Sequence, residues 1–210
     1  MNHTPPRKPP YFTTREWHSV LISAYYAAGK RKESVPIMER ALLNGRVHER
    51  MFSELFLHLS LLLGFPTMLE GLATLRKIAG KSRTVQERVQ SAQLVARRGK
   101  KVLRRIYGKT FDRLLINLKF LHDIVPAVIV RDVYGRIVAR PGMSLQEREI
   151  VNVVVLSIQR LDQQLYSHLR GALRIGVSGK TLRSAILTGA RIANTDATSA
   201  LKLLTTLSGT

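Results

Sequence analysis

The chain has 210 residues, of which 45% are apolar, so it can bury one sizeable core or two small ones. It contains no cysteine, which excludes disulfides, zinc–thiolate sites, iron–sulfur clusters and any reaction that needs a thiol of this chain. The net charge is +20, from 34 basic and 14 acidic residues. Such a charge favours anionic partners: nucleic acid, anionic lipid, acidic proteins or small anionic substrates.

The chain begins with "MNHTPPRKPPYFTT", which is polar, rich in proline and lacks the apolar core of a signal peptide. We expect residues 1–14 to form a flexible tail. The longest apolar run, at 55–65, is too short to cross a bilayer. We therefore expect a cytoplasmic protein without a membrane span.

Helical periodicity dominates the first half of the chain. The predicted helices cover residues 15–29, 34–43, 47–63, 67–79 and 84–98. "GFP" at 64–66 separates the third from the fourth, and Thr84 to Glu87 has the spacing of a capping box at the start of the fifth. We expect Trp17 and Phe65 to lie in the core.

Basic residues gather in the middle of the chain, where residues 81–113 carry 11 basic and 2 acidic side chains. The segment "RRGKKVLRR" at 97–105 has no interleaved aromatic residue, so base stacking and sequence preference should be weak. It is either a polyanion-binding surface or a solvated helix face. The candidate polyanion-binding residues are Arg97, Arg98, Lys100, Lys101, Arg104 and Arg105.

The second half of the chain also has helical periodicity. Residues 107–142 should hold two helices, with Pro126 near the start of the second; "IVPAVIV" could be a buried strand, but no partner strands are evident. Ser144 and Glu147 have capping-box spacing. Further helices are predicted over 145–159, 162–175, 179–193 and 196–207, which makes the fold all-α.

The triplet "GKT" at 179–181 does not indicate a phosphate-binding loop. That loop needs a glycine at position 174, where this chain has arginine, and it should follow a strand. We expect one helix to end at Gly176 and Ser178 to cap the next.

The two ends of the chain resemble each other. Residues 16–78 laid over 147–209 without gaps share nine identities, and both segments have the same order of helices and glycine stops. We predict two tandem helical repeats joined by a helical connector. The predicted divisions are a tail at 1–14, a first, degenerate repeat at 15–80, a basic connector at 81–142 and a second repeat at 143–210.

Residues 131–178, "RDVYGRIVARPGMSLQEREIVNVVVLSIQRLDQQLYSHLRGALRIGVS", resemble the carboxymuconolactone decarboxylase-like family, which includes the AhpD-like alkylhydroperoxidases. The similarity lies in the "YGR…RPG" approach, the "L-x-x-R-E" helix start and the "SHLRGAL…G" helix. "ALLNG" and "LLLGFPTMLEGLATLRK" carry it more weakly in the first repeat. The resemblance implies an all-α fold, assembly as trimers or hexamers, and either lactone decarboxylation or peroxide reduction through paired cysteines.

Carried over position by position, the resemblance assigns the family's proton-relay glutamate and histidine to Glu149 and His168. The two cysteine positions fall on Leu161 and Gln164, which removes the peroxidase chemistry. In the first repeat the glutamate and histidine positions hold His18 and Ile37, so that half looks chemically empty.

The spacing of Glu149 and His168 by itself, without the resemblance, predicts that the two side chains lie close together. Glu149 lies 11 residues before the turn at Arg160 and His168 lies 8 after it. In two antiparallel helices this places them within about 4–5 Å in height. Glu149 and His168 would transfer protons as general acid and base, and Arg148 or Arg170 would hold a substrate carboxylate. The alternative is that Glu149 compensates Arg148 and His168 is a surface residue beside Arg170.

Other sites find little support. His48, His58 and His122 are scattered, and Glu54 with His58 makes one i,i+4 pair, so no metal site is expected. No cofactor is expected either, because the chain lacks a dinucleotide fingerprint. We interpret Tyr107 and Tyr134, each followed by glycine, as structural turns.

Two functions remain open. One is a decarboxylase-like enzyme, a carboxy-lyase, acting on a small anionic substrate. The other is a catalytically degenerate binding or assembly module, whose basic connector holds nucleic acid or an acidic protein. In both cases we expect a homo-oligomer, with a trimer favoured, because a tandem chain should replace the pairs from which single-repeat relatives build hexamers.

Overall fold

A computed structural model describes residues 5–80 and 90–208 of the chain. No strand occurs in these ranges, which confirms the all-α prediction. The long helices are α1 (Thr14–Ala27), α2 (Arg31–Leu43), α3 (Glu49–Ala79), α4 (Ala92–Tyr107), α5 (Phe111–Leu121), α7 (Leu145–Ile158), α8 (Asp162–Arg174), α9 (Gly179–Ala193) and α10 (Thr198–Ser208). Shorter helical segments are η1 (Gly108–Thr110), α6 (Val125–Ala127) and the π-helix η2 (Val128–Val138).

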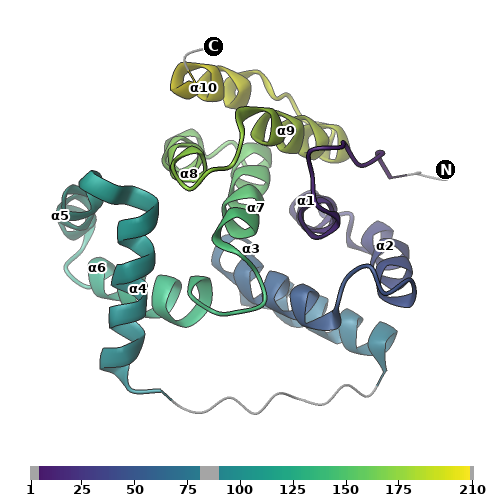
Figure 1. Cartoon of the computed structure of the whole chain (residues 1–210), viewed down its shortest axis with the longest axis horizontal. Coiled ribbons are helices and arrows are strands. Elements are labelled where there is room, and N and C mark those ends of the chain that lie inside the picture. Colours follow the sequence, from purple (N-terminus) through teal and green to yellow (C-terminus); the bar gives the residue numbers. More distant parts are fainter. Residues whose placement is uncertain (1–4, 81–89, 209–210) are drawn as a thin grey trace.

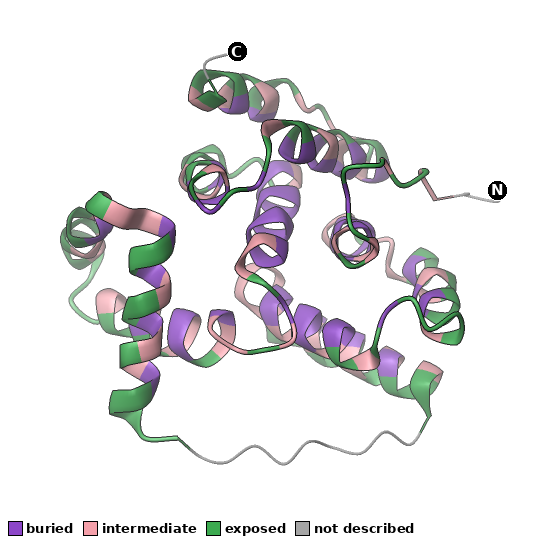
Figure 2. Ribbon diagram, in the orientation of Figure 1, coloured by how far each residue is buried: buried purple, intermediate pink, exposed green. Residues whose placement is uncertain are grey.

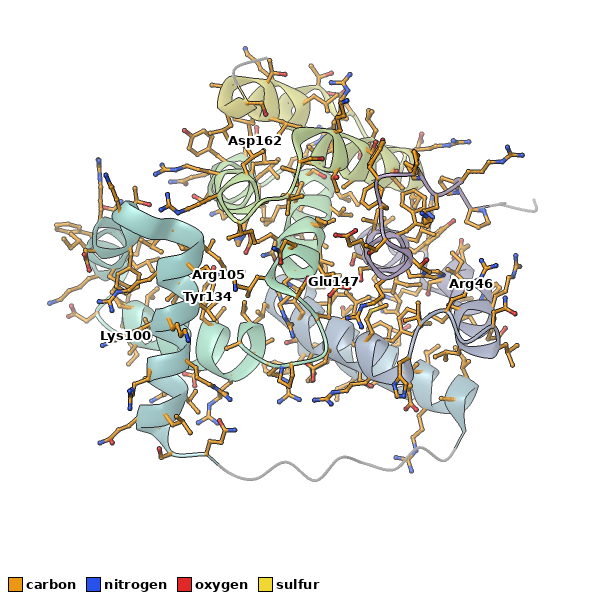
Figure 3. All side chains as sticks on the ribbon, in the orientation of Figure 1. Arg46, Lys100, Arg105, Tyr134, Glu147 and Asp162 are labelled. Carbon is orange, nitrogen blue, oxygen red and sulfur yellow. The ribbon has the colours of Figure 1, made fainter. Side chains whose placement is uncertain are left out.

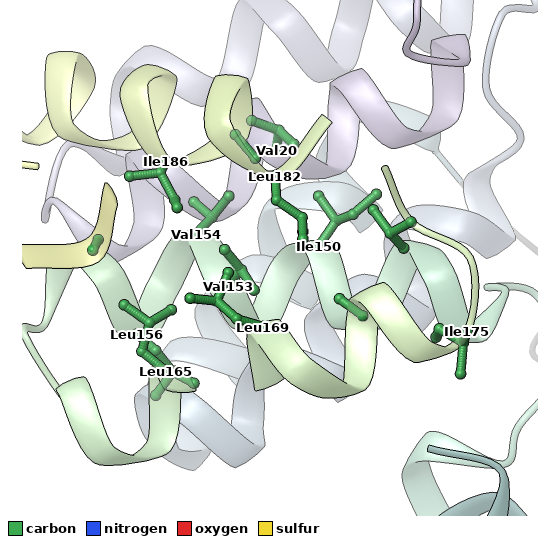
Figure 4. Close-up of a cluster of buried hydrophobic side chains, with 14 of the residues drawn as sticks. Val20, Ile150, Val153, Val154, Leu156, Leu165, Leu169, Ile175, Leu182 and Ile186 are labelled. Atoms are coloured by element: carbon green, nitrogen blue, oxygen red, sulfur yellow. The ribbon is translucent and has the colours of Figure 1, made fainter. Parts of the chain in front are cut away.

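Helix α7 is the centre of the molecule (Figure 1), with α1, α8 and α9 packed around it and α3 crossing below. Its sequence explains this position, because apolar residues occupy every face of the helix and not one stripe. Figure 2 shows α7 as the most continuously buried element. In Figure 4, Ile150, Val153 and Val154 meet Leu169 from α8 and Leu182 from α9.

Polar caps fix where the helices around α7 begin. Ser144 and Glu147 form the predicted capping box at the start of α7. Ser178 accepts a hydrogen bond from the Thr181 backbone and caps α9, as predicted. Gly176 follows the end of α8 with a φ of 94°, a conformation that favours glycine. The segment that ends in "GKT" is therefore a helix stop and a helix start, not a phosphate loop.

Helix α3 contains the two helices predicted over 47–63 and 67–79. They meet at Gly64, whose φ of 82° and ψ of 165° are not helical, and Pro66 follows two residues later. The prediction that Phe65 lies in the core is wrong: it is 67% exposed, because the kink places it on the outer side of the helix. Trp17 is buried, as predicted.

By length and hydropathy α3 alone among the described helices would suffice to cross a bilayer. Its first half, however, carries Glu54 and His58, both buried against α7. A charged residue and a histidine with partners on a neighbouring helix are typical of a core helix. The expectation that the chain has no membrane span stays a prediction.

Helix α4 differs from the helix predicted over 84–98. Its N-cap is Ser91, and it continues to Tyr107. The predicted capping box, Thr84 to Glu87, lies outside the described residues. The helix extends beyond Arg98 because Leu103 and Ile106 continue its buried face, and Gly99 sits where another backbone approaches.

The crossing of α4 over η2 is a contact between backbones. A Cβ atom on Gly99 would lie 1.8 Å from the carbonyl oxygen of Val130, and one on Gly135 would lie 2.4 Å from the carbonyl oxygen of Val95. Only glycine fits at these two positions. The Arg98 side chain adds a hydrogen bond of 3.0 Å from its Nη2 to the Gly135 carbonyl.

The segment around "IVPAVIV" is helical, as favoured, and Pro126 lies in its first turn, as predicted. It continues into η2, which is long for a π-helix. The π-helix is a rare conformation overall, but where it occurs it is often at a functional site. The interpretation of Tyr134 as a turn is therefore wrong, since it lies inside η2. Tyr107 does end α4, before Gly108 with a φ of 54°.

Candidate functional site

Glu149 and His168 meet between α7 and α8. His168 Nδ1 lies 2.8 Å from Glu149 Oε2. Glu149 is buried, at 1% exposed, and the His168 side chain is 19% exposed. The helical spacing thus predicted the geometry correctly, and only the imidazole reaches toward solvent. Their catalytic roles stay a prediction.

Asn152, one turn after Glu149 on α7, connects the pair to a third polar group. Its Nδ2 lies 3.3 Å from Glu149 Oε1 and 3.1 Å from His168 Nδ1. Its Oδ1 lies 2.8 Å from Nε2 of His58 on α3. An amide oxygen can only accept, so the neutral His58 donates through Nε2, and this contact orients the Asn152 amide.

His58 is held neutral by its surroundings. Burial, and then the positive charge of Arg148, lower the pKa of His58 to about 3. A neutral imidazole with its proton on Nε2 matches the Asn152 oxygen that it contacts. His58 is thus a fixed hydrogen-bond donor and not a proton carrier at neutral pH.

The Asn152 amide is compatible with two positions of one proton. When His168 Nδ1 holds the proton, it donates to the Glu149 carboxylate, and Asn152 donates to Oε1 of the same carboxylate. When Glu149 holds the proton, it donates to the single lone pair of His168 Nδ1, and Asn152 still donates to Oε1 of the same carboxyl group. The arrangement can therefore pass a proton between carboxylate and imidazole without losing its hydrogen bonds.

Two tyrosines lie near the pair. The hydroxyl groups of Tyr107 and Tyr134 are 3.2 Å apart. Burial, and then the nearby Glu149 carboxylate, raise the pKa of Tyr107 to about 12. Burial raises the pKa of Tyr134 further, with contributions from Tyr107 and Glu149. Both phenols stay protonated, so α4 and η2 cover the pair with neutral, largely buried groups.

A groove of about 260 Å³ lies between α8 and the α4–α5 corner, close to Glu149 and His168 although neither side chain lines it. Gly171, on the same face of α8 as His168, forms part of its wall. A Cβ at this position would lie 2.7 Å from Cγ2 of Ile106 and 3.6 Å from Glu149 Oε2, so glycine lets the groove approach the carboxylate. The polar side chains of the groove are Tyr107, Thr110, Arg113, Asn117, Tyr166, Ser167 and Arg170.

The two candidate substrate-binding arginines lie in different places. Arg170 is exposed and lines the groove. Arg148 is fully buried, and its Nη2 lies 3.2 Å from Glu54 Oε2 and 3.2 Å from the Arg140 carbonyl. A guanidinium enclosed in this way cannot reach a ligand in the groove. The position of Arg148 thus argues against the role predicted for it.

Arg148 takes part in one of two side-chain contacts that we together call the polar ladder. The contacts are Glu54 with Arg148 and His58 with Asn152. Each pair joins α3 to α7, and the members on each helix are four residues apart. Arg140 also binds Glu54, at 2.8 Å from Oε1. The polar ladder thus connects the first half of the chain to the candidate site in the second.

The remaining predicted positions fit simple roles. Leu161 and Gln164, at the cysteine positions, are exposed at the start of α8. His18 Nδ1 donates to the Thr14 carbonyl at 2.7 Å, within its own helix. In the described part of the chain, no group of three histidine, aspartate or glutamate side chains is arranged to hold a metal.

The basic residues of α4 form an exposed surface with one exception. Figure 3 shows Lys100 and Arg105 on this helix. Arg98 is half-buried and binds η2, so it is a structural residue rather than a free cation. Arg104 lies over the Phe111 ring, 4.9 Å from its centroid. The exposed set, which we call the basic face, is Arg97, Lys100, Lys101, Arg104 and Arg105.

Sequence reasoning missed Asn152 and His58. A signal existed for both: "RExxN" at 148–152 places Asn152 one turn from Glu149, and Glu54 and His58 interrupt one face of an otherwise apolar helix. Sequence alone could not show that these two faces meet.

Residues 129–206 match the model of a family described as the carboxymuconolactone decarboxylase family. The matched range begins at η2, inside the predicted connector, and includes Tyr134, Glu149, Asn152 and His168. No curated protein matches the chain.

Proposed function

We propose, since residues 129–206 match the model of the carboxymuconolactone decarboxylase family, that the protein is a carboxy-lyase for a small anionic substrate. The observation that carries the proposal is the hydrogen bond between Glu149 and His168, with Asn152 in reach of both. A proton that can occupy either group, one of them partly exposed, is what a decarboxylase needs to protonate the carbanion left by loss of CO₂.

The proposed step begins with Glu149 protonated and with His168 carrying its proton on Nε2. The substrate bond between carbon and carboxylate breaks, CO₂ leaves, and the electron pair remains on carbon, delocalised into an adjacent carbonyl of the substrate. His168 Nε2 then gives its proton to that carbon. His168 Nδ1 takes the proton of Glu149, so the step ends with a Glu149 carboxylate.

The groove beside the pair supplies the substrate-binding side of the proposal. Arg170 and Arg113 line it and can each hold a carboxylate or a polarised carbonyl of the substrate through two parallel hydrogen bonds. A volume of about 260 Å³ is just below the usual range for small-molecule sites, so the proposed substrate is small. Peroxide reduction through thiols is not proposed, because the chain contains no cysteine.

The test is CO₂ release from a panel of small lactone and β-keto carboxylates. With any substrate that is turned over, His168→Ala and Glu149→Gln should each reduce kcat/KM by about 10² to 10⁴. Gln163→Ala, an exposed change on the same helix, is the matched control and should leave the rate unchanged. Turnover that survives both site variants, with helicity intact, would overturn the proposed roles.

A second candidate function rests on the basic face of α4. Its five exposed cations project from a helix that is fixed by the Gly99–Gly135 crossing, which suits a polyanion. Changing Arg97, Lys100, Lys101 and Arg104 to glutamine should weaken binding to duplex DNA and flatten its salt dependence. The matched control changes four exposed cations of α9 and α10, Lys180, Arg183, Arg191 and Lys202, and removes the same net charge. Equal losses from both sets would reject a specific surface.

A further inference from the structure

A second cavity lies in the first half of the chain, between α1, α2 and the segment that precedes α1. Its volume is about 310 Å³, at the lower end of the range for small-molecule sites. Its lining includes Trp17 and Leu21 from α1 and Ile37 from α2, which give it an apolar floor.

The position of this cavity follows from the alignment of the two halves. Where the second half has Glu149, Asn152 and His168, the first half has His18, Leu21 and Ile37. All three of these first-half residues line the cavity. The place that holds the polar network in one half is therefore an open cavity with an apolar floor in the other.

The charges around the cavity are mostly positive. Lys8, Arg40 and Arg46 line it, against one acidic residue, Glu33. The Lys8 ammonium donates to the Phe12 carbonyl at 2.8 Å. Arg40 and Arg46 are exposed and make no ion pair with any described residue, so both guanidinium groups are available to a ligand. Figure 3 shows Arg46 beside α2.

From the apolar floor and the two unpaired arginines we infer that this cavity binds a small carboxylate with an apolar body. The carboxylate would pair with Arg40 and Arg46 at the mouth, and the apolar part would lie on Trp17, Leu21 and Ile37. The half of the chain that lacks the proton-relay residues thus acts as a binding site. This inference does not depend on the reaction proposed for the other half.

Trp17 provides a specific readout, because it is the protein's only tryptophan and it lines the cavity. The experiment titrates the full-length protein with cyclohexanecarboxylate, which does not absorb where tryptophan does, and follows Trp17 fluorescence. A saturable change is expected. Cyclohexanecarboxamide, a neutral molecule of the same shape, should bind at least about tenfold more weakly, since it cannot pair with the arginines.

The variants locate the site. Arg40→Gln with Arg46→Gln should weaken binding of the carboxylate about tenfold or more. The matched control, Lys32→Gln with Arg76→Gln, removes two exposed cations of α2 and α3 that do not line the cavity, and should leave the affinity unchanged. Arg170→Gln, in the other groove, should also have no effect on the Trp17 signal.

Three results would overturn the inference. The first is no saturable change in Trp17 fluorescence up to millimolar carboxylate. The second is equal affinity for the carboxylate and the carboxamide. The third is an affinity that falls as much in the control pair, or in Arg170→Gln, as in the arginine pair of the cavity.

Discussion

The segments α1–α3 and α7–α10, which we call the first unit and the second unit, share several local features. Helices α1 and α7 have 14 residues each, α2 and α8 have 13 each, and both α1 and α7 begin with a capping box. A residue with positive φ follows the first helix of each unit, Gly29 and Arg160, and another follows the second, Gly45 and Gly176. These correspondences support the tandem repeat, which stays a prediction.

The two units differ in what fills the space between their first two helices. The second unit has a buried polar network there, covered by Ile106 and Tyr107 of α4. The first unit has apolar side chains and an open cavity. Caps and turns thus maintain the helical framework, while a few side chains between the helices decide whether it can carry proton chemistry.

The largest effect on stability should come from the charge in the polar ladder. Glu54→Gln leaves the fully buried Arg148 without its carboxylate, which should lower the free energy of unfolding by about 3–5 kcal/mol. Glu33→Gln, at the exposed rim of the first-unit cavity, is the matched control and should change it by less than about 0.5 kcal/mol. Urea denaturation measures both; similar values for the two variants would show that the ladder is not a stabilising contact.

The second-largest effect on stability should come from replacing a residue of the second unit by the residue at the aligned position of the first unit. Asn152→Leu introduces the residue found at the aligned position, Leu21, and removes the hydrogen-bond partner of His58 Nε2 and of Glu149 Oε1. The unpaired polar groups should cost about 1–3 kcal/mol. Any decarboxylase turnover should fall as well, because His168 loses a group that orients it.

Asn152→Asp separates these two consequences. It keeps the acceptor for His58 but cannot donate to Glu149 or His168. Asn152→Asp should therefore lower turnover while the hydrogen bond from His58 Nε2 is kept. Full activity in both variants would mean that Asn152 does not position the pair.

A third effect concerns pH. Because the pKa of His58 is about 3 in the folded protein and near 6.5 when unfolded, the unfolded chain binds one more proton between these values. Stability should therefore fall as pH falls from 6.5, by roughly 1 kcal/mol per pH unit from this group. His58→Gln should reduce that slope, measured by urea denaturation between pH 7 and 4, whereas His122→Gln, an exposed change, should not. An unchanged slope in His58→Gln would contradict the cause given for it.

The smallest effect on stability, and the clearest on assembly, should come from the region between the units. Ile116, Phe120, Leu121 and Ile124, on and just after α5, are all more than half exposed, which is unusual for large apolar residues so close together. If the protein forms the expected trimer through this surface, Phe120→Ser with Leu121→Ser should give monomers in light scattering without loss of helicity. Leu43→Ser, an exposed leucine of the first unit, is the control. A monomeric unmodified protein would refute the expectation of an oligomer.

The sequence was informative where structure is decided locally. The capping box at Ser144, the stop at Gly176 and the spacing of Glu149 and His168 are properties of one helix or of one helix pair, and all were predicted. Asn152, His58 and the burial of Arg148 depend on which face of α3 meets α7, and that is decided by packing between distant segments. Ser91, which caps the start of α4, was not predicted either.

The contact between Gly99 and Gly135 affects which surface residues of α4 can be substituted during evolution. Because main-chain atoms of α4 and η2 touch, the direction of α4 depends on two small residues and not on the side chains that it exposes. Cations can be gained, lost or moved along the outer face without altering where the helix points. Selection can therefore adjust the charge pattern of this helix independently of Tyr107 and Ile106, which the same helix places over the second unit's polar network.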